Sequence, residues 1–414
     1  MNYKFLIQNF EFKIQNLKFK IAILLISAAF AAQAQNGYDA VLQQIEANNT
    51  TLAALRQQTN AEKIGNRTGL TPANPEVEFN YLWGSPALIG SRTDISVRQT
   101  FDFPTAYAHR GRIAGLQNEN AELAYKAERI NVLLTAKQTC VELACFNAIA
   151  NEYAARLQNA ERIAAAFKTK WDAGEVSILE HNRAQLNLST VQADVARIEA
   201  EQTALLSELK RLNGGKEILN FKLQILNSEF KIQNSELPSN FEDWYATAES
   251  KSPVLQYVSG QIEINRQQVK LNQALGLPKF SAGYMSEKVV GQHFQGVTLG
   301  VSIPLWENKN RVNYARAQTQ AAELALEDSK VQFYNRLQSQ HLKAVALQKN
   351  AQKMRQSLSD YGNEPLLKKA LDAGEISLLN YLLEIEYYYD AMNKVLEAER
   401  DFELAAAELW AVEL

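Results

Sequence analysis

The chain has 414 residues, of which 46% are hydrophobic and 21% charged, and its formal net charge is −3. Only 18 glycines and 9 prolines interrupt it, a bias typical of long helices rather than of a mixed α/β enzyme. The near-balanced charge excludes the basic surface that nucleic-acid binding needs, so no nucleic-acid partner is expected.

The first 34 residues have the pattern of an export signal. Lys18 and Lys20 precede an apolar stretch, and Ala32-Gln33-Ala34 forms a small-x-small cleavage site. The apolar core of about twelve residues is shorter than the roughly twenty that a membrane-spanning helix needs. We therefore expect residues 1–34 to be a signal peptide and the mature chain to begin near Gln35.

No later stretch is long and apolar enough for a transmembrane helix, so a membrane-embedded part would have to be a β-barrel. Cys140 and Cys145 lie five residues apart in a helical stretch and point about 140° from each other, which favours neither a disulfide nor a shared metal site. The four histidines are isolated, and the chain has no glycine-rich phosphate loop and no nucleophile beside a base. The sequence therefore predicts no metal, no cofactor and no enzymatic activity.

An internal repeat organises the chain. Residues 172–179, Asp-Ala-Gly-Glu-Val-Ser-Ile-Leu, recur as residues 372–379, Asp-Ala-Gly-Glu-Ile-Ser-Leu-Leu, and Phe103-Pro104 recurs as Ile303-Pro304 at the same offset. Each copy has the pattern of a helix, a strand pair and a long helix pair. We expect a first repeat over 35–213, with strands within 76–103 and a tip near residue 174. The second covers 238–414, with strands within 279–305 and a tip near residue 374.

The predicted strands alternate between apolar and polar side chains. Glu76–Trp83 has one apolar row, and Thr93–Phe103 has apolar residues on one face and Asp94, Ser96, Arg98, Thr100 and Asp102 on the other. This period, over about ten residues, is typical of outer-membrane barrel strands with a lipid face and a lumen face. Taken alone, the same pattern also fits a half-buried hairpin of a soluble domain.

Long helices follow the strands. No proline interrupts residues 107–172, which predicts a helix on the order of 100 Å long. The returning helix carries apolar residues at coiled-coil spacing from Leu188 to Leu212, and the second copy does so from Leu378 to Leu396. We expect the helices to fold back in pairs at Gly174 and Gly374, with Ser177 and Ser377 capping the returning helices.

One segment departs from this plan. Phe230-Lys231-Ile232-Gln233-Asn234 repeats residues 12–16, and both stretches share a Phe/Lys/Ile/Gln/Asn bias. We interpret 214–237 as a linker that includes a repetitive insertion.

The tip motif Ala-Gly-Glu-(Val/Ile)-Ser-x-Leu, together with the two strand pairs, resembles the TolC family of outer-membrane factors over the whole mature chain. The tip spelling and Asn74-Pro75-Glu76 are most similar to the CzcC/CusC-like branch. The resemblance implies a mainly α fold with a small membrane β part. In it, antiparallel coiled-coil helices form a periplasmic α-barrel, and four strands per protomer contribute to a trimeric twelve-stranded outer-membrane β-barrel.

The resemblance also implies a set of sites. Adaptor docking is expected at the tips, at Gly174, Glu175, Ser177, Gly374, Glu375 and Ser377. A pore constriction is expected at Glu180, Arg183, Asn380 and Glu384, although the acidic residues also fit a role in stabilising helix N-termini. The family often has an acidic residue six positions after the tip glycine, and Asn380 departs from that pattern. The barrel lumen would be lined by the polar row from Asp94 to Asp102.

The predicted function is passive conduction of metal ions or drugs through the cell outer membrane, by a homotrimer spanning into the periplasm. Its partners would be a periplasmic adaptor protein, an inner-membrane pump of the resistance-nodulation-division type and outer-membrane lipid. Two alternatives remain open: the duct of a type I protein secretion system, and a secreted coiled-coil structural or adhesion protein.

Overall fold

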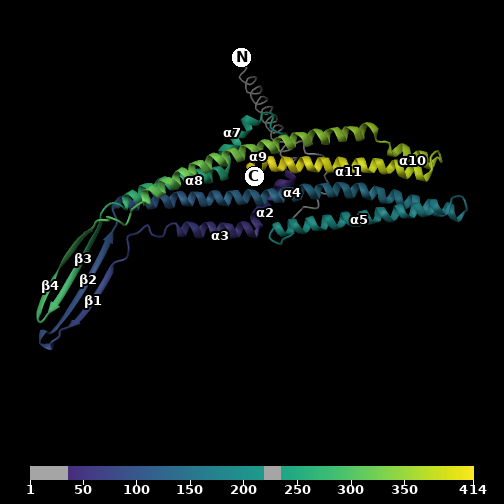
Figure 1. Ribbon diagram of the computed structural model, residues 1–414. Helices are drawn as coiled ribbons and strands as arrows, with labels where there is room; N and C mark the ends of the chain where they lie inside the picture. The colour runs from purple at the N-terminus through teal and green to yellow at the C-terminus, as the bar shows by residue number, and fades with distance from the viewer. Residues whose placement is uncertain (1–35, 219–234) are drawn as a thin grey trace, which may run out of the picture. The chain divides into compact units, whose positions relative to one another are not determined.

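A computed structural model describes residues 36–218 and 235–414. The predicted signal peptide and most of the predicted linker lie outside the described residues. In chain order the elements are α2 (Asn36–Asn48), α3 (Thr50–Gly65), β1 (Glu76–Trp83), η1 (Ala87–Ile89), β2 (Ser91–Phe101), α4 (Pro104–Asp172), α5 (Ile178–Leu212), α7 (Phe241–Lys251), α8 (Pro253–Ala274), β3 (Lys279–Val289), β4 (Gln292–Ser302), α9 (Arg311–Tyr361), α10 (Glu364–Asp372), α11 (Leu378–Leu409) and η2 (Trp410–Glu413) (Figure 1). The predicted fold class, mainly helical with four strands, is confirmed.

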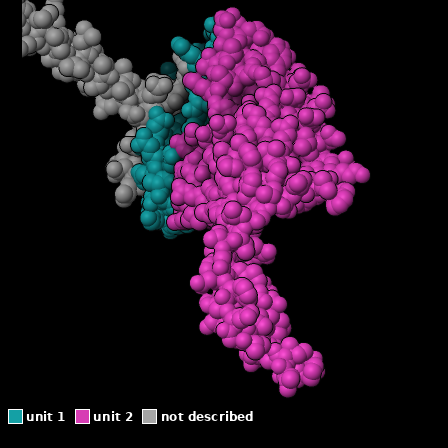
Figure 2. Space-filling view, turned by 90° about the vertical axis from the view of Figure 1, so that its left-hand side faces the viewer, with its two compact units in different colours: residues 1–52, 130–239, 339–414 teal, residues 53–129, 240–338 magenta. Residues whose placement is uncertain are grey.

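The chain forms two compact units, and each contains segments from both halves of the sequence (Figure 2). Unit 1 comprises residues 1–52, 130–239 and 339–414, and unit 2 comprises residues 53–129 and 240–338. The predicted division into two repeats with a linker stays a prediction.

Unit 2 contains one antiparallel sheet in the order β1-β2-β3-β4, and this sheet extends from the helices of the unit as a narrow ribbon (Figures 1 and 2). A continuous register joins the two sequence halves, because Val97 of β2 pairs with Tyr284 of β3. β2 begins and ends two residues earlier than predicted. Asp102 therefore lies beyond the strand, where its carboxylate accepts a hydrogen bond from Arg110 at 2.5 Å.

The helices of unit 2 pack beside the base of this sheet. Pro104 starts α4, where a missing N–H leaves no helical hydrogen bond unmade. Ala106 and Ile113 of α4 then pack against Ile264 and Leu271 of α8. Gly260 of α8 permits close approach, since a Cβ there would lie 2.0 Å from the Asn120 side-chain oxygen.

Unit 1 is a layer of long helices in which α4 lies between α5 and α11 (Figure 1). Val41 and Ile45 of α2 are buried against Leu143 of α4 and Leu209 of α5. The predicted coiled-coil positions of α5, from Leu188 to Leu212, are buried or half-buried. Gln202 occupies the one polar position of this series, and its side chain donates a hydrogen bond to Asn147 of α4 at 2.6 Å.

Both cysteines of α4 are fully buried and free. Burial raises the pKa of each thiol to about 12, so both stay protonated at neutral pH. α4 also contains one stretch, half of it buried, that has the length and composition of a membrane span. The expectation that no later stretch would do so was wrong.

The second descending helix differs from its expected form. α9 ends at Tyr361, and the nine-residue α10 begins at Glu364 after a break at Gly362 and Asn363. Pro365 lies in the first turn of α10. Proline has no backbone N–H to donate to the preceding turn, so it is accommodated at the start of a helix rather than inside one. The two descending helices therefore differ, because α4 is unbroken to Asp172.

Candidate functional site

The two helix–helix turns of unit 1 have the same backbone chemistry. Gly174 and Gly374 adopt φ values of 77° and 75°, a left-handed conformation that favours glycine. The N–H of the following residue closes each turn, from Glu175 to the Lys170 carbonyl at 2.8 Å and from Glu375 to the Ala370 carbonyl at 2.9 Å. We call residues 173–177 the first turn and residues 373–377 the second turn.

The helices that leave the two turns are capped differently. The Ser177 hydroxyl accepts from the Glu180 N–H at 3.3 Å, and the Glu180 carboxylate accepts from the Ser177 N–H at 3.0 Å, which completes a capping box. The hydrogen bonds that the Glu180 carboxylate accepts, first from the Ser177 backbone N–H and then from the Ser177 hydroxyl, lower the pKa of Glu180. In the second turn the Ser377 hydroxyl accepts from the Asn380 N–H at 3.2 Å, and no reciprocal bond from an acid forms.

An apolar cluster fills the space between the two turns. Phe167 of α4 and Ala184 of α5 are buried against Leu378, Tyr381 and Ile385 of α11. Val176 and Ile376, which occupy equivalent positions of the two repeats, pack against the same cluster. We call this set the turn cluster.

Polar contacts tie the same helices together. Asn159 of α4 donates to the Tyr381 hydroxyl at 2.8 Å, and Arg162 of α4 pairs with Asp372 at 2.8 Å. Both contacts join the first hairpin to the second, so they resist separation of the turns.

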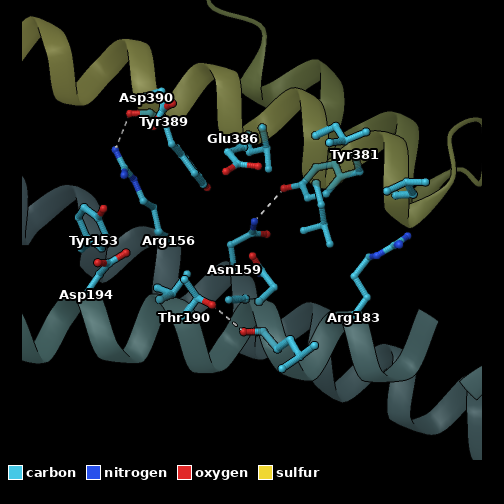
Figure 3. Close-up of a pocket in the computed structure, with 18 of the residues that line it drawn as sticks. Tyr153, Arg156, Asn159, Arg183, Thr190, Asp194, Tyr381, Glu386, Tyr389 and Asp390 are labelled. Carbon is cyan, nitrogen blue, oxygen red and sulfur yellow. Dashed lines mark hydrogen bonds between the residues drawn. The ribbon is translucent and has the colours of Figure 1, made fainter. Parts of the chain in front are cut away.

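A groove of about 440 Å³ lies between α5 and α11, and α4 contributes to its lining (Figure 3). Arg156 is 4% exposed there, with its guanidinium 4.4 Å from the Tyr153 ring centroid and 4.2 Å from that of Tyr389. It donates to Asn393 at 2.9 Å, and its Nε has no partner among the described residues. Because this buried arginine bonds to α11, it acts as a further link between α4 and α11.

The predicted constriction residues do not meet in one chain. Arg183 lines the groove of Figure 3. Glu384 lines a different groove, of about 590 Å³, between α9 and α11, and it lies beyond the first turn of α11. Glu180 is half-buried and Asn380 is exposed, each near the start of its helix.

In the sheet of unit 2, most charged side chains lie on one face and most large apolar side chains lie on the other. On the polar face, Arg98 pairs with Glu76 at 2.8 Å, and Arg92 bonds to Asp94 at 2.9 Å and to Glu287 at 3.2 Å. Ser96 and Thr100 lie on the same face by the strand period. The sheet thus has a charged face on which five of its charges form ion pairs.

The other face exposes large apolar side chains. Phe79 is 65% exposed, Trp83 80% and Leu299 83%, and Val77 and Val301 are also exposed. Burying one such side chain contributes on the order of 1.5–3 kcal/mol, so leaving a whole face uncovered in water is unfavourable. The strands of the isolated chain therefore have the surface of a membrane or assembly interface.

Several features of these sites were missed from the sequence. Gly362-Asn363-Glu364-Pro365 contains the stop and start residues of a helix break, and that signal was available. The buried positions of Arg156 and Glu399 had no such signal, because they depend on which faces of distant helices meet. Among the described residues, no group of three or more His, Cys, Asp or Glu side chains is placed to hold a metal ion.

The hairpin pairs of long helices, the glycine turns and the four-stranded sheet together define the fold of TolC-type outer-membrane channels. The match to the Campylobacter jejuni CmeC outer membrane channel covers 91% of this chain and 85% of that chain, with a TM-score of 0.71 and 15% identity. The channel-forming protein CusC matches with a TM-score of 0.75, 12% identity and 92% of its chain covered. The outer membrane protein VceC from Vibrio cholerae matches with a TM-score of 0.72, 15% identity and 95% of its chain covered.

Comparison with protein-family models gives no match, and comparison with curated protein sequences gives none either. The likeness therefore lies in the fold, at 12–15% identity to the three structures.

Proposed function

We propose that this chain is one protomer of a homotrimeric duct in the cell outer membrane, which conducts substrates passively and performs no enzymatic step. The observation that carries the proposal is the sheet of unit 2, with one exposed apolar face, one charged face and two open edges. Open strand edges cannot face lipid, so four strands per chain require closure with other copies. The apolar face then contacts lipid and the charged face lines the lumen, from Asp94 to Thr100.

Unit 1 supplies the periplasmic end of the duct. The exposed turns dock a periplasmic adaptor through Gly174, Glu175, Ser177, Gly374, Glu375 and Ser377, and the adaptor connects to an inner-membrane pump of the resistance-nodulation-division type. Glu180, Arg183, Asn380 and Glu384 belong to a constriction assembled from three chains. The likeness to solved outer-membrane and transmembrane channels supports a duct, and we extend the proposal to the efflux of metal ions or drugs.

A deletion strain tests the function directly. It is challenged with zinc, cobalt, cadmium and copper, and in parallel with detergents, bile salts and dyes. Selective metal sensitivity with metal accumulation supports a metal-efflux duct, and broad sensitivity to amphiphiles supports a general one. Loss of a secreted protein, with neither sensitivity, would instead identify a type I secretion duct.

Fractionation tests the membrane assignment separately. The protein should be recovered from the outer membrane as a trimer that dissociates only on heating in detergent. Recovery as a soluble periplasmic protein would contradict the duct and favour the coiled-coil spacer.

A further inference from the structure

A groove of about 500 Å³ lies between α8 and α9 in unit 2, and its lining includes the cations Arg266, Lys270 and Arg316. We propose that this groove binds the phosphate headgroup of an anionic phospholipid in the periplasmic leaflet of the outer membrane. This rests on the proposed function, because it needs the sheet of unit 2 to lie in that membrane. It adds a lipid site to the duct, and the evidence is the charge of the groove and its place beside the base of the sheet.

Two of the three cations have no acidic partner. The guanidinium of Arg266 lies 2.8 Å from the Glu323 carboxylate and 3.8 Å from that of Glu263, so its charge is compensated. Lys270 and Arg316 are exposed and form no ion pair with any described residue. Two uncompensated cations in one groove favour an anionic ligand, and a phosphate oxygen accepts hydrogen bonds from both ammonium and guanidinium groups.

The equivalent place in the first repeat lacks this charge. Leu116 stands 200 residues before Arg316, and the acid Glu119 stands 200 residues before Thr319. Leu116 packs against the apolar contacts between α4 and α8. The basic groove is therefore a property of the second copy and not a requirement of the helices that both copies share.

The side chains between the sheet and the groove follow the order of a lipid leaflet. Ile303 and Leu305, which follow β4, are exposed and apolar, and Trp306 next to them is also exposed. α9 then begins at Arg311, close to the cations of the groove. From strand to helix the surface thus changes from apolar to aromatic to basic, as in a chain that leaves the hydrocarbon through the headgroups.

The depth of the two free cations matches the headgroup layer. Lys270 lies four residues before the end of α8, and Arg316 lies five residues after the start of α9. At 1.5 Å per residue, both lie about 6–8 Å from these helix ends. The polar layer is about 5–8 Å thick on each side of a bilayer, and long basic side chains extend to reach it. Both cations can therefore contact a lipid phosphate.

The groove opens on the outer side of the helix wall. Spacings of four and three residues along α9 lead from Arg316 to Lys330 and Tyr334 on the same helix face. Both of these side chains contact α7. Lys330 pairs with Glu249 at 2.8 Å, and the Tyr334 hydroxyl donates to Glu242 at 2.7 Å. A further helix stacked on the wall of a duct lies outside it, because the lumen has to stay open. The groove on the same face therefore opens toward the lipid.

Apolar side chains at the groove favour a lipid over a free phosphate. Val269 lines the groove, and Leu277 is exposed in the turn that follows α8. Acyl chains bury such surfaces and continue along the apolar face of the sheet, whereas a free phosphate gains nothing from them.

Lipid retention tests the site with two matched double variants. Lys270→Gln with Arg316→Gln removes the two free cations of the groove. Lys126→Gln with Lys251→Gln removes the same charge from exposed positions of unit 2 outside the groove. Each full-length chain is reconstituted into vesicles of equal parts phosphatidylglycerol and phosphatidylcholine with the same acyl chains. Native mass spectrometry in mild detergent then counts the lipids that each trimer retains.

We expect the unmodified trimer to retain phosphatidylglycerol in preference to phosphatidylcholine, at one lipid per chain. Each cation contributes about fivefold to the affinity for an anionic lipid, so the groove variant should retain at least about tenfold less. The control variant should match the unmodified chain. The single variants Lys270→Gln and Arg316→Gln, each about fivefold weaker, provide the same test if the double variant does not assemble.

Unchanged retention by the groove variants, or an equal loss in the control, would overturn the site. Equal retention of the two lipids by the unmodified trimer would do so as well. Displacement of the lipid by millimolar inorganic phosphate would show that the groove recognises a free phosphate instead. A trimer in vesicles that retains no lipid would overturn this site alone, whereas a monomer that stays outside the vesicles would overturn the proposed function too.

Discussion

A charge on the apolar face of β4 should prevent membrane assembly, whereas the same charge one residue away should not. Leu299 and Thr298 are adjacent and both exposed in the isolated chain, yet they face opposite sides of the sheet. Leu299 lies between Val297 and Val301 in the exposed apolar row of β4, so in the proposed barrel it lies well inside the apolar layer of the bilayer. Thr298 pairs with Gly283 on the polar face, where an arginine has room and water.

The magnitude follows from that position. Arginine near the bilayer midplane on a lipid face costs about 2–4 kcal/mol, which is about 6–12 kcal/mol for three chains. If the sheet were instead exposed to water, replacing a side chain that is 83% exposed would change the stability by only about 0.5 kcal/mol. We therefore expect Leu299→Arg to lose most of the folded trimer and Thr298→Arg to retain it.

The assay is folding of each variant into lipid vesicles, followed by its urea midpoint and by the heat-sensitive trimer band on a gel. The matched pair separates the effect of the face from the effect of adding a charge to β4. Equal behaviour of the two variants, whether both fold or both fail, would refute the assignment of the lipid face.

Three further predictions concern unit 1. Ser177→Ala should lower the free energy of unfolding by about 1 kcal/mol, a larger loss than that of Ser377→Ala, because only Ser177 belongs to a capping box. Thermal unfolding followed by circular dichroism measures both losses, and equal losses would contradict the prediction. Burial raises the pKa of Glu403 to about 7, and one of its carboxylate oxygens has no partner among the described residues. Because the unfolded state releases this proton first, stability should fall between about pH 4.5 and 7, by on the order of 3 kcal/mol. Glu403→Gln should abolish that fall in urea titrations, and an unchanged pH profile would count against it. Arg162→Ala should raise the single-channel open probability by up to about fivefold, since an exposed ion pair contributes at most about 1 kcal/mol. The control Arg197→Ala loses only an ion pair within α5 and should leave the open probability unchanged. Equal effects of the two variants would show that the ion pair between the hairpins does not keep the turns together.

Local signals explain what could be predicted from the sequence. The strands were visible because their side chains alternate with period two, as in Val77, Phe79 and Tyr81. The turns were visible because a left-handed residue needs glycine at positions 174 and 374. Both signals depend on residues within a few positions of each other, so a single chain suffices to read them.

Pairings between distant residues could not be predicted in the same way. The register of Val97 with Tyr284 joins residues far apart in the chain, and no local pattern specifies it. The same holds for Glu399, a 1%-exposed carboxylate in α11 that binds Arg355 of α9 at 2.5–2.6 Å. Burial raises the pKa of Glu399, and the ion pair offsets part of that cost. A solvated glutamate and a buried one look alike in a sequence.

The two repeats have the same turns but differ in what surrounds them. His181 stacks on Trp171 of its own hairpin, with ring centroids 4.9 Å apart and an interplanar angle of 13°. At the equivalent position 200 residues later, Tyr381 instead accepts a hydrogen bond from Asn159 of the first hairpin. At these two equivalent positions, the first hairpin has a contact within itself and the second has a contact with the first. If the turns separate when the duct opens, the contact between Asn159 and Tyr381 is lost, and the break in the descending helix at Gly362 gives the second hairpin a point at which to bend.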